Sequence, residues 1–367
     1  MRTGIKLLFL VSQLQTGGSE RTVTYLSSYL AKRQFDVTIL SLSDDIFYKQ
    51  DEQVKVQTLN IESKAKNIWG RIWLARRRFL EVKQYLQKNK FDIVFCILPE
   101  MARYLLKIHK KAGFCLITSE RNNPAVVTQK HLLKLKHKIY QKSDGIVFQT
   151  QRAMDFYPES IRKKGVVIHN AVGNPYVYQV PEIQNRKPKI SAMGRLTDQK
   201  DYKSLIRAFQ PITEKYPVYT LEIYGTGPDE NKLKALVKDL GMENSVKLCG
   251  VHKDAILKVA DSACYVMSSK YEGMPNALME AMAVGLPCVS TDCPNGPAEL
   301  IKNGENGLLV PVGDVEALTA AMFTMIERKT FANKCGKNAK RILETHSIEK
   351  NAKAYLDYIL KIYDKDE

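Results

Sequence analysis

Residues 263–290 read ACYVMSSKYEGMPNALMEAMAVGLPCVS, and this stretch is the clearest guide to the fold. An apolar run of strand length opens it, and a polar loop follows. Pro275 then stands near a helix start, good helix formers come after it, and Gly285 marks the helix end. A second apolar run begins at Pro287. The stretch therefore predicts a short helix between two strands, which is the repeating unit of a parallel sheet.

Short apolar strands alternate with amphipathic helices over the whole chain, in two series. The first series of expected strands comprises 6–12, 36–41, 91–98, 115–119, 145–149 and 166–169. The second series comprises 189–193, 219–224, 245–248, 263–267, 287–290 and 307–310. Such alternation favours an α/β fold with helices on both faces of parallel sheets.

A break separates the two series. The segment 173–188 is rich in turn-forming and polar residues and shows little periodicity, which is typical of a linker. We expect two doubly wound, Rossmann-like domains facing across a cleft, at residues 1–172 and 173–349. A C-terminal helix at about 350–367 is expected to pack back on the first domain. Ligands of such sheets bind at the carboxyl ends of the strands, so a site between the domains is expected.

Composition excludes several classes of protein. With 367 residues and 44% hydrophobic residues, the chain can bury a large core and is not typical of disordered or fibrous proteins. Its longest apolar runs fall short of the about 18 residues of a spanning helix. The seven cysteines are scattered singly, without a C-x-x-C pair, which favours reduced thiols in a cytoplasmic protein.

The net charge of +17 is concentrated in the first part of the chain. Residues 1–175 contain 30 Lys and Arg against 14 Asp and Glu, whereas residues 176–367 contain 26 against 25. The basic excess is densest at 64–90, with nine basic residues against one acidic, and at 103–142, with ten against one. A solvated helix face and a surface for an anionic partner both fit such runs.

Two loops that follow expected strands carry candidate binding residues. Gly17 and Gly18 precede a helix, where backbone N–H groups can meet an anion or a sugar oxygen, although a glycine pair can also simply turn a strand–helix corner. In the second series, Gly194-Arg195 and Lys200 follow the strand 189–193. An arginine fork and a lysine point charge at this spacing suit the two phosphates of a diphosphate, whereas a basic surface loop is the alternative.

The 263–290 stretch supplies two carboxylates, Glu272 in the loop and Glu280 in the helix, eight residues apart. One can reach a sugar while the other reaches the hydroxyls of a ribose. The N–H groups of Gly273, Met274, Asn276 and Ala277, with Pro275 at the helix start, would face a phosphate at the helix N-terminus, where the dipole favours negative charge.

These motifs, in this order, resemble those of family 4 of the glycosyltransferases, retaining enzymes of the GT-B fold that build bacterial surface polysaccharides. The resemblance implies that Arg195 and Lys200 neutralise the diphosphate of a nucleotide-sugar donor, that Glu280 binds its ribose and that Glu272 contacts the transferred sugar. The stretch 292–299, DCPNGPAE, resembles that of galactosyl- or N-acetylgalactosaminyltransferases acting on lipid-linked saccharides. The resemblance favours a UDP-sugar as donor, and catalysis is assigned to electrostatics without a cofactor or metal ion.

One position departs from the family pattern. Many relatives place a histidine near the sugar at the strand end that here reads SERNNP, residues 119–124. Glu120 or Arg121 is the candidate substitute, and the leaving phosphate itself is the alternative acceptor of the proton. The six histidines show no metal-ligand spacing, so no metal site is expected.

The basic first domain suggests a peripheral enzyme at the inner face of the cell membrane. In 68–85, tryptophans and aliphatic residues alternate with arginines, a pattern typical of an interfacial helix on anionic lipid, and 131–140 adds a second cationic amphipathic segment. Ordinary basic helices with tryptophans in the core are the alternative. Nucleic-acid binding is disfavoured because no nucleic-acid-binding motif is present. A sugar-nucleotide epimerase or a non-catalytic carbohydrate-binding relative of the same fold stays open.

Overall fold

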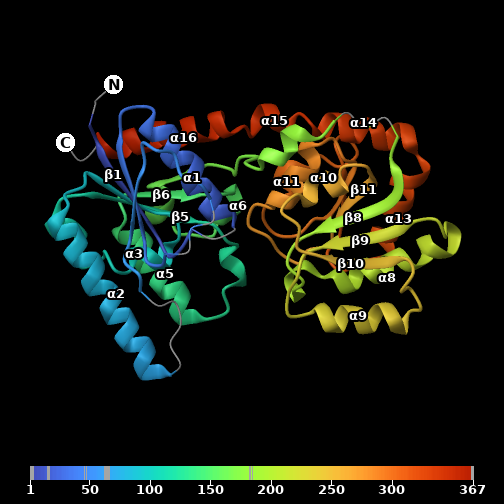
Figure 1. The fold of residues 1–367 in the computed structure, drawn as a ribbon, viewed down its shortest axis with the longest axis horizontal. Coiled ribbons are helices and arrows are strands. Elements are labelled where there is room, and N and C mark those ends of the chain that lie inside the picture. The colour runs from blue at the N-terminus through green and yellow to red at the C-terminus, as the bar shows by residue number, and fades with distance from the viewer. Residues whose placement is uncertain are drawn as a thin grey trace. The chain divides into compact units, whose positions relative to one another are not determined.

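The computed structural model describes residues 4–14, 17–44, 46, 48–61, 67–181, 183 and 185–364. The chain divides into two compact units, which are described separately (Figure 1). The first unit comprises Met1–Gly173 and Ile348–Glu367, and the second comprises Asn174–Ser347.

The first unit is built on a seven-stranded sheet in the order β3-β2-β1-β4-β5-β6-β7, in which all neighbours are parallel. Its strands are β1 (Lys6–Val11), β2 (Asp36–Ser41), β3 (Lys55–Thr58), β4 (Ile93–Cys96), β5 (Cys115–Glu120), β6 (Gly145–Phe148) and β7 (Gly165–Val167). Its helices are α1 (Gly18–Ala31), α2 (Ile68–Lys88), α3 (Pro99–Ala102), α4 (His109–Ala112), η1 (Pro124–Val126), α5 (Lys130–Lys142), α6 (Gln151–Asp155), α7 (Glu159–Arg162) and α16 (Ile348–Tyr363).

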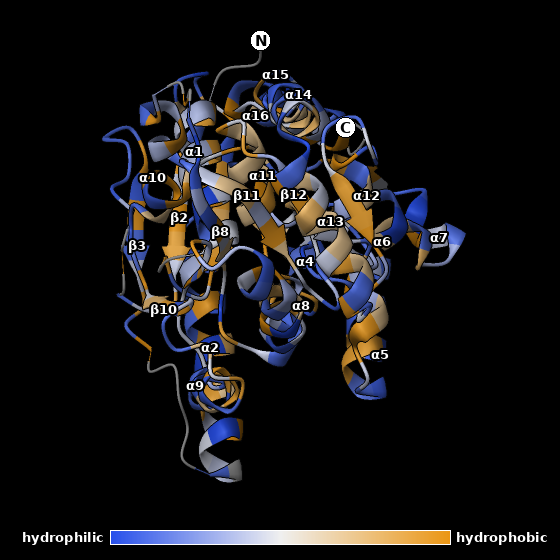
Figure 2. Ribbon diagram, turned by 90° about the vertical axis from the view of Figure 1, so that its right-hand side faces the viewer, coloured by the Kyte–Doolittle hydropathy of each residue, from blue (hydrophilic) through white to orange (hydrophobic). Residues whose placement is uncertain are grey.

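Apolar side chains cover both faces of this sheet. On one face, Val23 and Leu26 of α1 and Tyr355 and Ile359 of α16 pack against the strands. On the other face, α2 contributes buried Leu74, Val82 and Leu86. Figure 2 colours the chain by hydropathy, with strands in largely apolar colours and helices of mixed colour. The sheet is thus buried on both sides, as parallel sheets require.

The second unit is built on a six-stranded parallel sheet in the order β10-β9-β8-β11-β12-β13. Its strands are β8 (Lys187–Met193), β9 (Thr220–Tyr224), β10 (Val246–Gly250), β11 (Ser262–Met267), β12 (Cys288–Thr291) and β13 (Leu308–Val310). Its helices are η2 (Pro175–Gln179), η3 (Asp198–Lys200), α8 (Tyr202–Lys215), α9 (Glu230–Asp239), α10 (Ala255–Val259), α11 (Asn276–Ala283), α12 (Pro297–Leu300), α13 (Val315–Glu327), α14 (Lys329–Ala339) and α15 (Ile342–Thr345).

Every stretch that the sequence predicts as a strand overlaps a strand of the structure. The prediction missed β3, because its residues alternate between exposed and half-buried positions at the sheet edge and supply no apolar run. The α/β class with two doubly wound, parallel sheets is confirmed. Across the described residues, none of the helices has both the length and the apolar character that spanning a membrane requires.

Candidate active site

The second unit has a topological switch point between β8 and β11. The chain proceeds from β8 outward to β9 and β10, and then returns to place β11 on the other side of β8. The loops that follow β8 and β11 therefore lie on either side of the switch point, at the carboxyl edge of the sheet, which is where doubly wound sheets bind ligands. Arg195 and Lys200 follow β8, and Glu272 follows β11.

Hydrogen bonds hold these two loops against each other. The backbone N–H of Lys270 donates to the carbonyl of Gln199 at 2.8 Å. The side-chain amide of Gln199 donates to the carbonyl of Tyr271 at 2.9 Å, and the Ser268 hydroxyl donates to the carbonyl of Lys200 at 2.8 Å. The relative position of Lys200 and Glu272 is consequently fixed by backbone contacts on either side of them.

Lys200 and Glu272 form an ion pair at the centre of this arrangement. The Lys200 Nζ lies 2.6 Å from Glu272 Oε1, and the Ser269 hydroxyl donates to the same oxygen at 2.6 Å. Their side chains are only 18% and 8% exposed. The aliphatic stem of Lys200 crosses Gly194, where an added Cβ would lie 3.0 Å from Lys200 Cε. The Tyr202 hydroxyl would lie at 2.9 Å from the same Cβ, so a side chain at Gly194 would crowd both neighbours.

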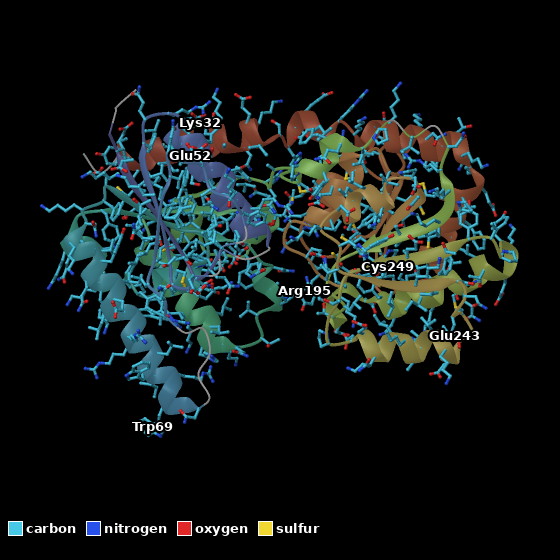
Figure 3. All side chains as sticks on the ribbon, in the orientation of Figure 1. Lys32, Glu52, Trp69, Arg195, Glu243 and Cys249 are labelled. Atoms are coloured by element: carbon cyan, nitrogen blue, oxygen red, sulfur yellow. The ribbon has the colours of Figure 1, made fainter. Side chains whose placement is uncertain are left out.

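Arg195 is exposed at the end of β8 (Figure 3). Within the described residues it forms no ion pair, because the neighbouring carboxylates are engaged elsewhere. Asp198 pairs with Lys270 at 2.6 Å, and that hydrogen bond holds the pKa of Asp198 below its ordinary value. Asp201 accepts from the Ser204 hydroxyl at 2.8 Å. Among the described residues, the Arg195 guanidinium is thus not paired with a carboxylate of its own loop.

The predicted short helix is α11. Its N-cap residue is Pro275, and no side chain caps the N-terminus. On this helix the Glu280 carboxylate accepts a 2.9 Å hydrogen bond from the Asn174 amide, whose oxygen in turn accepts from the N–H of Tyr176 at 3.1 Å. The sequence does not predict this role of Asn174, because its partner lies 106 positions away and gives no local signal.

Three glycines that the sequence analysis did not single out shape this edge. An added Cβ at Gly225 would lie 1.9 Å from the carbonyl oxygen of Gly194, and one at Gly227 would lie 2.3 Å from that of Leu196. An added Cβ at Gly296 would lie 2.5 Å from the carbonyl oxygen of Gly273. These close approaches bring the loops after β9 and β12 against the two binding loops.

Burial also affects the ionisation of neighbouring groups. Burial, together with the charge of Glu272, raises the pKa of the Cys293 thiol to about 12. The same two causes raise the pKa of Tyr202 above its ordinary value. Both groups therefore stay neutral near physiological pH and add no charge to this edge.

In the first unit, the glycine pair begins α1. Gly17 is the N-cap residue of α1, and Gly18 is its first residue. An added Cβ at Gly17 would lie 2.2 Å from a carboxylate oxygen of Glu20, so the Glu20 side chain folds back over the glycine. Burial raises the pKa of Glu20. The Glu20 carboxylate therefore lies in the first turn of α1, beside the glycine pair.

Glu120 is buried inside the first unit, with its side chain 0% exposed. Its carboxylate pairs with Lys136 at 2.9 Å and accepts from the hydroxyls of Tyr140 and Tyr157 at 3.1 and 2.7 Å. The backbone N–H of Asn122 donates to its other oxygen at 3.3 Å. These contacts occupy the carboxylate and tie the end of β5 to α5, and the predicted catalytic role stays a prediction.

Arg121 is 7% exposed and joins distant parts of the first unit. Its guanidinium donates to Thr22 of α1 at 2.9 Å, to Asn170 at 3.0 Å and to Tyr355 of α16 at 3.1 Å. Three partners on three different segments fix the guanidinium in place. Its role in catalysis likewise stays a prediction.

Metal ligation was not expected from the sequence. In the part of the chain that the structure describes, no group of three or more His, Cys, Asp or Glu side chains is placed to hold a metal ion. Arg195, Lys200 and the N-terminus of α11 contribute positive charge at the carboxyl edge of the second sheet.

Comparison with known proteins agrees with the architecture. Residues 16–173 match Glycosyltransferase Family 4, and residues 178–342 match Glycosyl transferases group 1. The two matches together cover most of the chain, which belongs to the glycosyltransferases that combine these two domains. The resemblance inferred from the motifs is therefore confirmed, and the chain is a glycosyltransferase.

Individual relatives span nearly the full length of the chain. The chain is 26% identical to a Campylobacter jejuni protein named N-acetylgalactosamine-N,N'-diacetylbacillosaminyl-diphospho-undecaprenol 4-alpha-N-acetylgalactosaminyltransferase, over 96% of this chain and 99% of that protein. It is 26% identical to the amylovoran biosynthesis glycosyltransferase AmsD of Erwinia amylovora, over 91% and 95% of the two chains. The structure of Anabaena HepE in complex with UDP and glucose superposes with a TM-score of 0.76 at 16% identity, over 97% and 100% of the chains. The GT-B fold class is confirmed.

Proposed function

We propose that this chain is a retaining glycosyltransferase that moves a hexose or N-acetylhexosamine from a UDP-sugar to a lipid-linked saccharide in bacterial surface polysaccharide synthesis. The observation that carries the proposal is the placement of Lys200, Glu272 and Arg195 at the switch point of the second sheet. Two cations and a carboxylate at this edge suit a diphosphate that is joined to a sugar.

Each group has a distinct task in the proposed donor complex. Arg195 and Lys200 neutralise the diphosphate, and the N–H groups at the start of α11 face a phosphate, so that the leaving diphosphate is stabilised as its charge develops. Glu272 then exchanges part of its contact with Lys200 for a hydroxyl of the sugar. Glu280, positioned by Asn174, accepts from the ribose hydroxyls.

The transfer replaces one bond at the anomeric carbon with another. The bond between this carbon and the diphosphate oxygen breaks as the acceptor oxygen attacks from the same face, and the acceptor proton passes to the departing phosphate oxygen. This route requires no separate base, which fits a Glu120 carboxylate that is already occupied by Lys136, Tyr140 and Tyr157. The retaining outcome rests on membership of the family.

The relatives support the proposed donor and acceptor. The Campylobacter jejuni relative is named for transfer to a saccharide on diphospho-undecaprenol, and the Erwinia relative for biosynthesis of amylovoran. The Anabaena structure with a similar fold contains UDP and glucose. A lipid-linked acceptor lies in a membrane, and the anionic surface of that membrane attracts a basic unit.

Helix α2 supports binding at a membrane surface. Trp69 and Trp73 are 77% and 60% exposed, and Ile72 is 57% exposed, so these side chains are not core residues of the first unit. Figure 3 labels Trp69 near the free end of the helix. Aromatic side chains at headgroup depth, beside arginines that each add about 1 kcal/mol on anionic lipid, are typical of interfacial helices.

Tryptophan fluorescence tests this surface without a substitution, because Trp69 and Trp73 are the two tryptophans of the chain. Vesicles of phosphatidylglycerol are expected to shift the emission to shorter wavelength, and added salt should reverse the shift. Vesicles of neutral phosphatidylcholine serve as the control. Unchanged emission on anionic vesicles at low salt would reject the membrane proposal.

Protection against thermal unfolding by a panel of UDP- and GDP-sugars tests the donor site, because a ligand of the folded state raises its apparent stability. We expect a UDP-sugar to protect the protein. Lys200→Ala or Glu280→Ala should weaken donor binding roughly 10- to 150-fold, as expected for hydrogen bonds to charged groups. Lys203→Ala, at an exposed position in the same region, is the matched control.

Equal donor affinity in Lys200→Ala, Glu280→Ala and the wild type would reject this site. Incubation with donor alone and with donor plus lipid-linked acceptor then separates transfer from epimerisation, since epimerisation needs no acceptor. We propose that no metal ion takes part, so excess EDTA should leave the initial rate of transfer unchanged. Loss of the rate in EDTA, with recovery on adding Mg²⁺ or Mn²⁺, would contradict that part of the proposal.

A further inference from the structure

The amino-terminal edge of the first sheet contains two adjacent cavities. Asp144 directly precedes β6 and borders both cavities, so they lie at the opposite end of the strands from the edge at which these sheets bind ligands. One cavity, of about 360 Å³, is lined by residues of 106–111, 141–144 and Lys164. The other, of about 510 Å³, shares His109, Lys110 and Asp144 with it.

The smaller cavity is strongly cationic. Its lining includes five lysines, which are Lys107, Lys110, Lys111, Lys142 and Lys164. The ammonium of Lys164 is held by the carbonyls of Gln141 and Ser143, at 2.9 and 3.0 Å. The other four lysines form no ion pair with any residue that the structure describes.

Asp144 is the one acidic residue of this lining, and it is already engaged. Its carboxylate accepts from the backbone N–H of Leu116 at 2.7 Å, where it caps the neighbouring strand. Asp144 supplies one negative charge against the five positive charges of the lysines, and its carboxylate also binds a backbone N–H group. Lys107, Lys110, Lys111 and Lys142 are exposed, and a bound anion would reduce the repulsion among the ammonium groups of the lining.

His109 provides a second, independent sign of a ligand. The residue is 3% exposed and borders both cavities, yet neither ring nitrogen has a hydrogen-bond partner among the described residues. Its ring packs on Phe114 with 6.2 Å between the centroids. A buried polar group without a partner is unfavourable, so a ligand that accepts from the imidazole would remove that cost.

We propose that the smaller cavity, which we call the His109 pocket, is a second anion site that binds a phosphate or diphosphate group. Lysine ammonium groups are compact point charges on flexible stems, which can surround a tetrahedral phosphate, whereas planar carboxylates are better matched by arginine forks. A protonated imidazole would add a buried donor. The phosphate group belongs either to a free anion or to the headgroup of an anionic lipid.

The site is separate from the proposed donor site, since it lies in the other unit and involves none of the donor residues. The protonation of His109 in this pocket should also respond to a bound ligand. Burial lowers the pKa of His109, and the charges of Lys110, Lys142 and Lys164 lower it further against the opposing charge of Asp144. A bound anion favours the imidazolium, so binding should raise the pKa of His109.

Histidine-selective NMR of the full chain tests the pocket, because the chain has only six histidines. A His109→Gln variant assigns the signal. Titration with inorganic pyrophosphate is expected to shift the His109 resonances with a submillimolar dissociation constant. The double variant Lys110→Ala/Lys142→Ala should weaken this response at least tenfold, because it removes two of the five cations.

Lys163→Ala is the matched control, since Lys163 neighbours Lys164 in sequence but pairs with Glu159 and does not line the pocket. Phosphatidylcholine vesicles containing phosphatidic acid form the second arm. A shift with pyrophosphate supports a free anion, and a shift with vesicles alone supports a lipid headgroup. No shift of His109 in either arm, or an equal shift in the double variant that retains the wild-type circular dichroism, would overturn the proposal.

Discussion

Lys200 and Glu272 form an ion pair in the structure, although Lys200 is assigned to the diphosphate of the donor and Glu272 to its sugar. The pair is largely buried, and the Ser269 hydroxyl completes the hydrogen bonding of the carboxylate. Removing one charge of such a pair leaves the other uncompensated. The two residues can therefore be separated experimentally only by ligands that engage one of them.

Substitution of Glu272 by glutamine makes this separation. UDP carries the diphosphate but no sugar, so Glu272→Gln should bind UDP at least as well as the wild type, because Lys200 no longer has a competing carboxylate. The additional affinity of the UDP-sugar over UDP should disappear, and the turnover number should fall by roughly 10²- to 10³-fold. Calorimetric titration with both ligands and an initial-rate assay measure the two effects.

Ser269→Ala is the companion variant, because it removes one hydrogen bond to Glu272 and keeps the charge. Its turnover should fall much less than that of Glu272→Gln. Equal losses in the two variants would mean that the charge of Glu272 does not act on the transferred sugar.

Glu120 shows how a buried carboxylate can be mainly structural. Removal of one partner from a buried ion pair costs about 3–5 kcal/mol. Glu120→Gln or Lys136→Met should accordingly destabilise the protein by about that amount in urea unfolding, and the double variant Glu120→Gln/Lys136→Met by clearly less than the sum of the two. Additive losses would show that the 2.9 Å contact contributes no coupling.

At the level of the loops, close glycine contacts hold the donor edge together. Gly225 has a φ of +147°, and an added Cβ would lie 1.9 Å from the backbone oxygen of Gly194. Neither the backbone conformation nor the contact tolerates a side chain. The loop after β9 can therefore contact the loop that carries Arg195 and Lys200 only while Gly194 and Gly225 have no side chain.

Gly225→Ala is expected to cost about 3 kcal/mol or more, from strain and overpacking, and to lower the melting temperature by roughly 6–12 °C. Donor binding should weaken with it. Gly304→Ala is the matched control, because Gly304 has a φ of +79° but open space around it, so only the smaller conformational cost applies. Similar losses in both variants would refute the role assigned to the contact.

The same loops explain how far the sequence can predict this molecule. Periodicity locates the buried strands, because each needs an apolar run, but the half-exposed edge strand β3 lacks one. Local motifs locate Arg195, Lys200 and Glu272, because each lies just after a predictable strand. The contacts of Glu280 with Asn174 and of Glu120 with Tyr157 join residues 106 and 37 positions apart, and no local pattern encodes them.

At the scale of the whole molecule, the first unit is closed by a segment from the far end of the chain. Helix α16 contributes buried residues to the same core as β1 and α1. The Tyr358 hydroxyl accepts from the backbone N–H of Ile146 at 2.8 Å, and Tyr355 accepts from Arg121 at 3.1 Å. The first unit therefore depends on residues that are synthesised after the second unit.

Deletion of residues 348–367 tests this dependence. The deletion exposes the partners of Ala352, Tyr355, Leu356, Tyr358, Ile359 and Ile362. At about 1.5–3 kcal/mol for each large apolar side chain, the loss is on the order of 10 kcal/mol, which is comparable with the whole stability of a typical domain. We expect hydrogen exchange to become fast in β1, β4 and β5 while β8 and β11 stay protected.

A full-length variant, Lys353→Ala, controls for changes at an exposed position of the same helix. Slow exchange in β1 and β5 after the deletion would show that the first unit closes its core without α16.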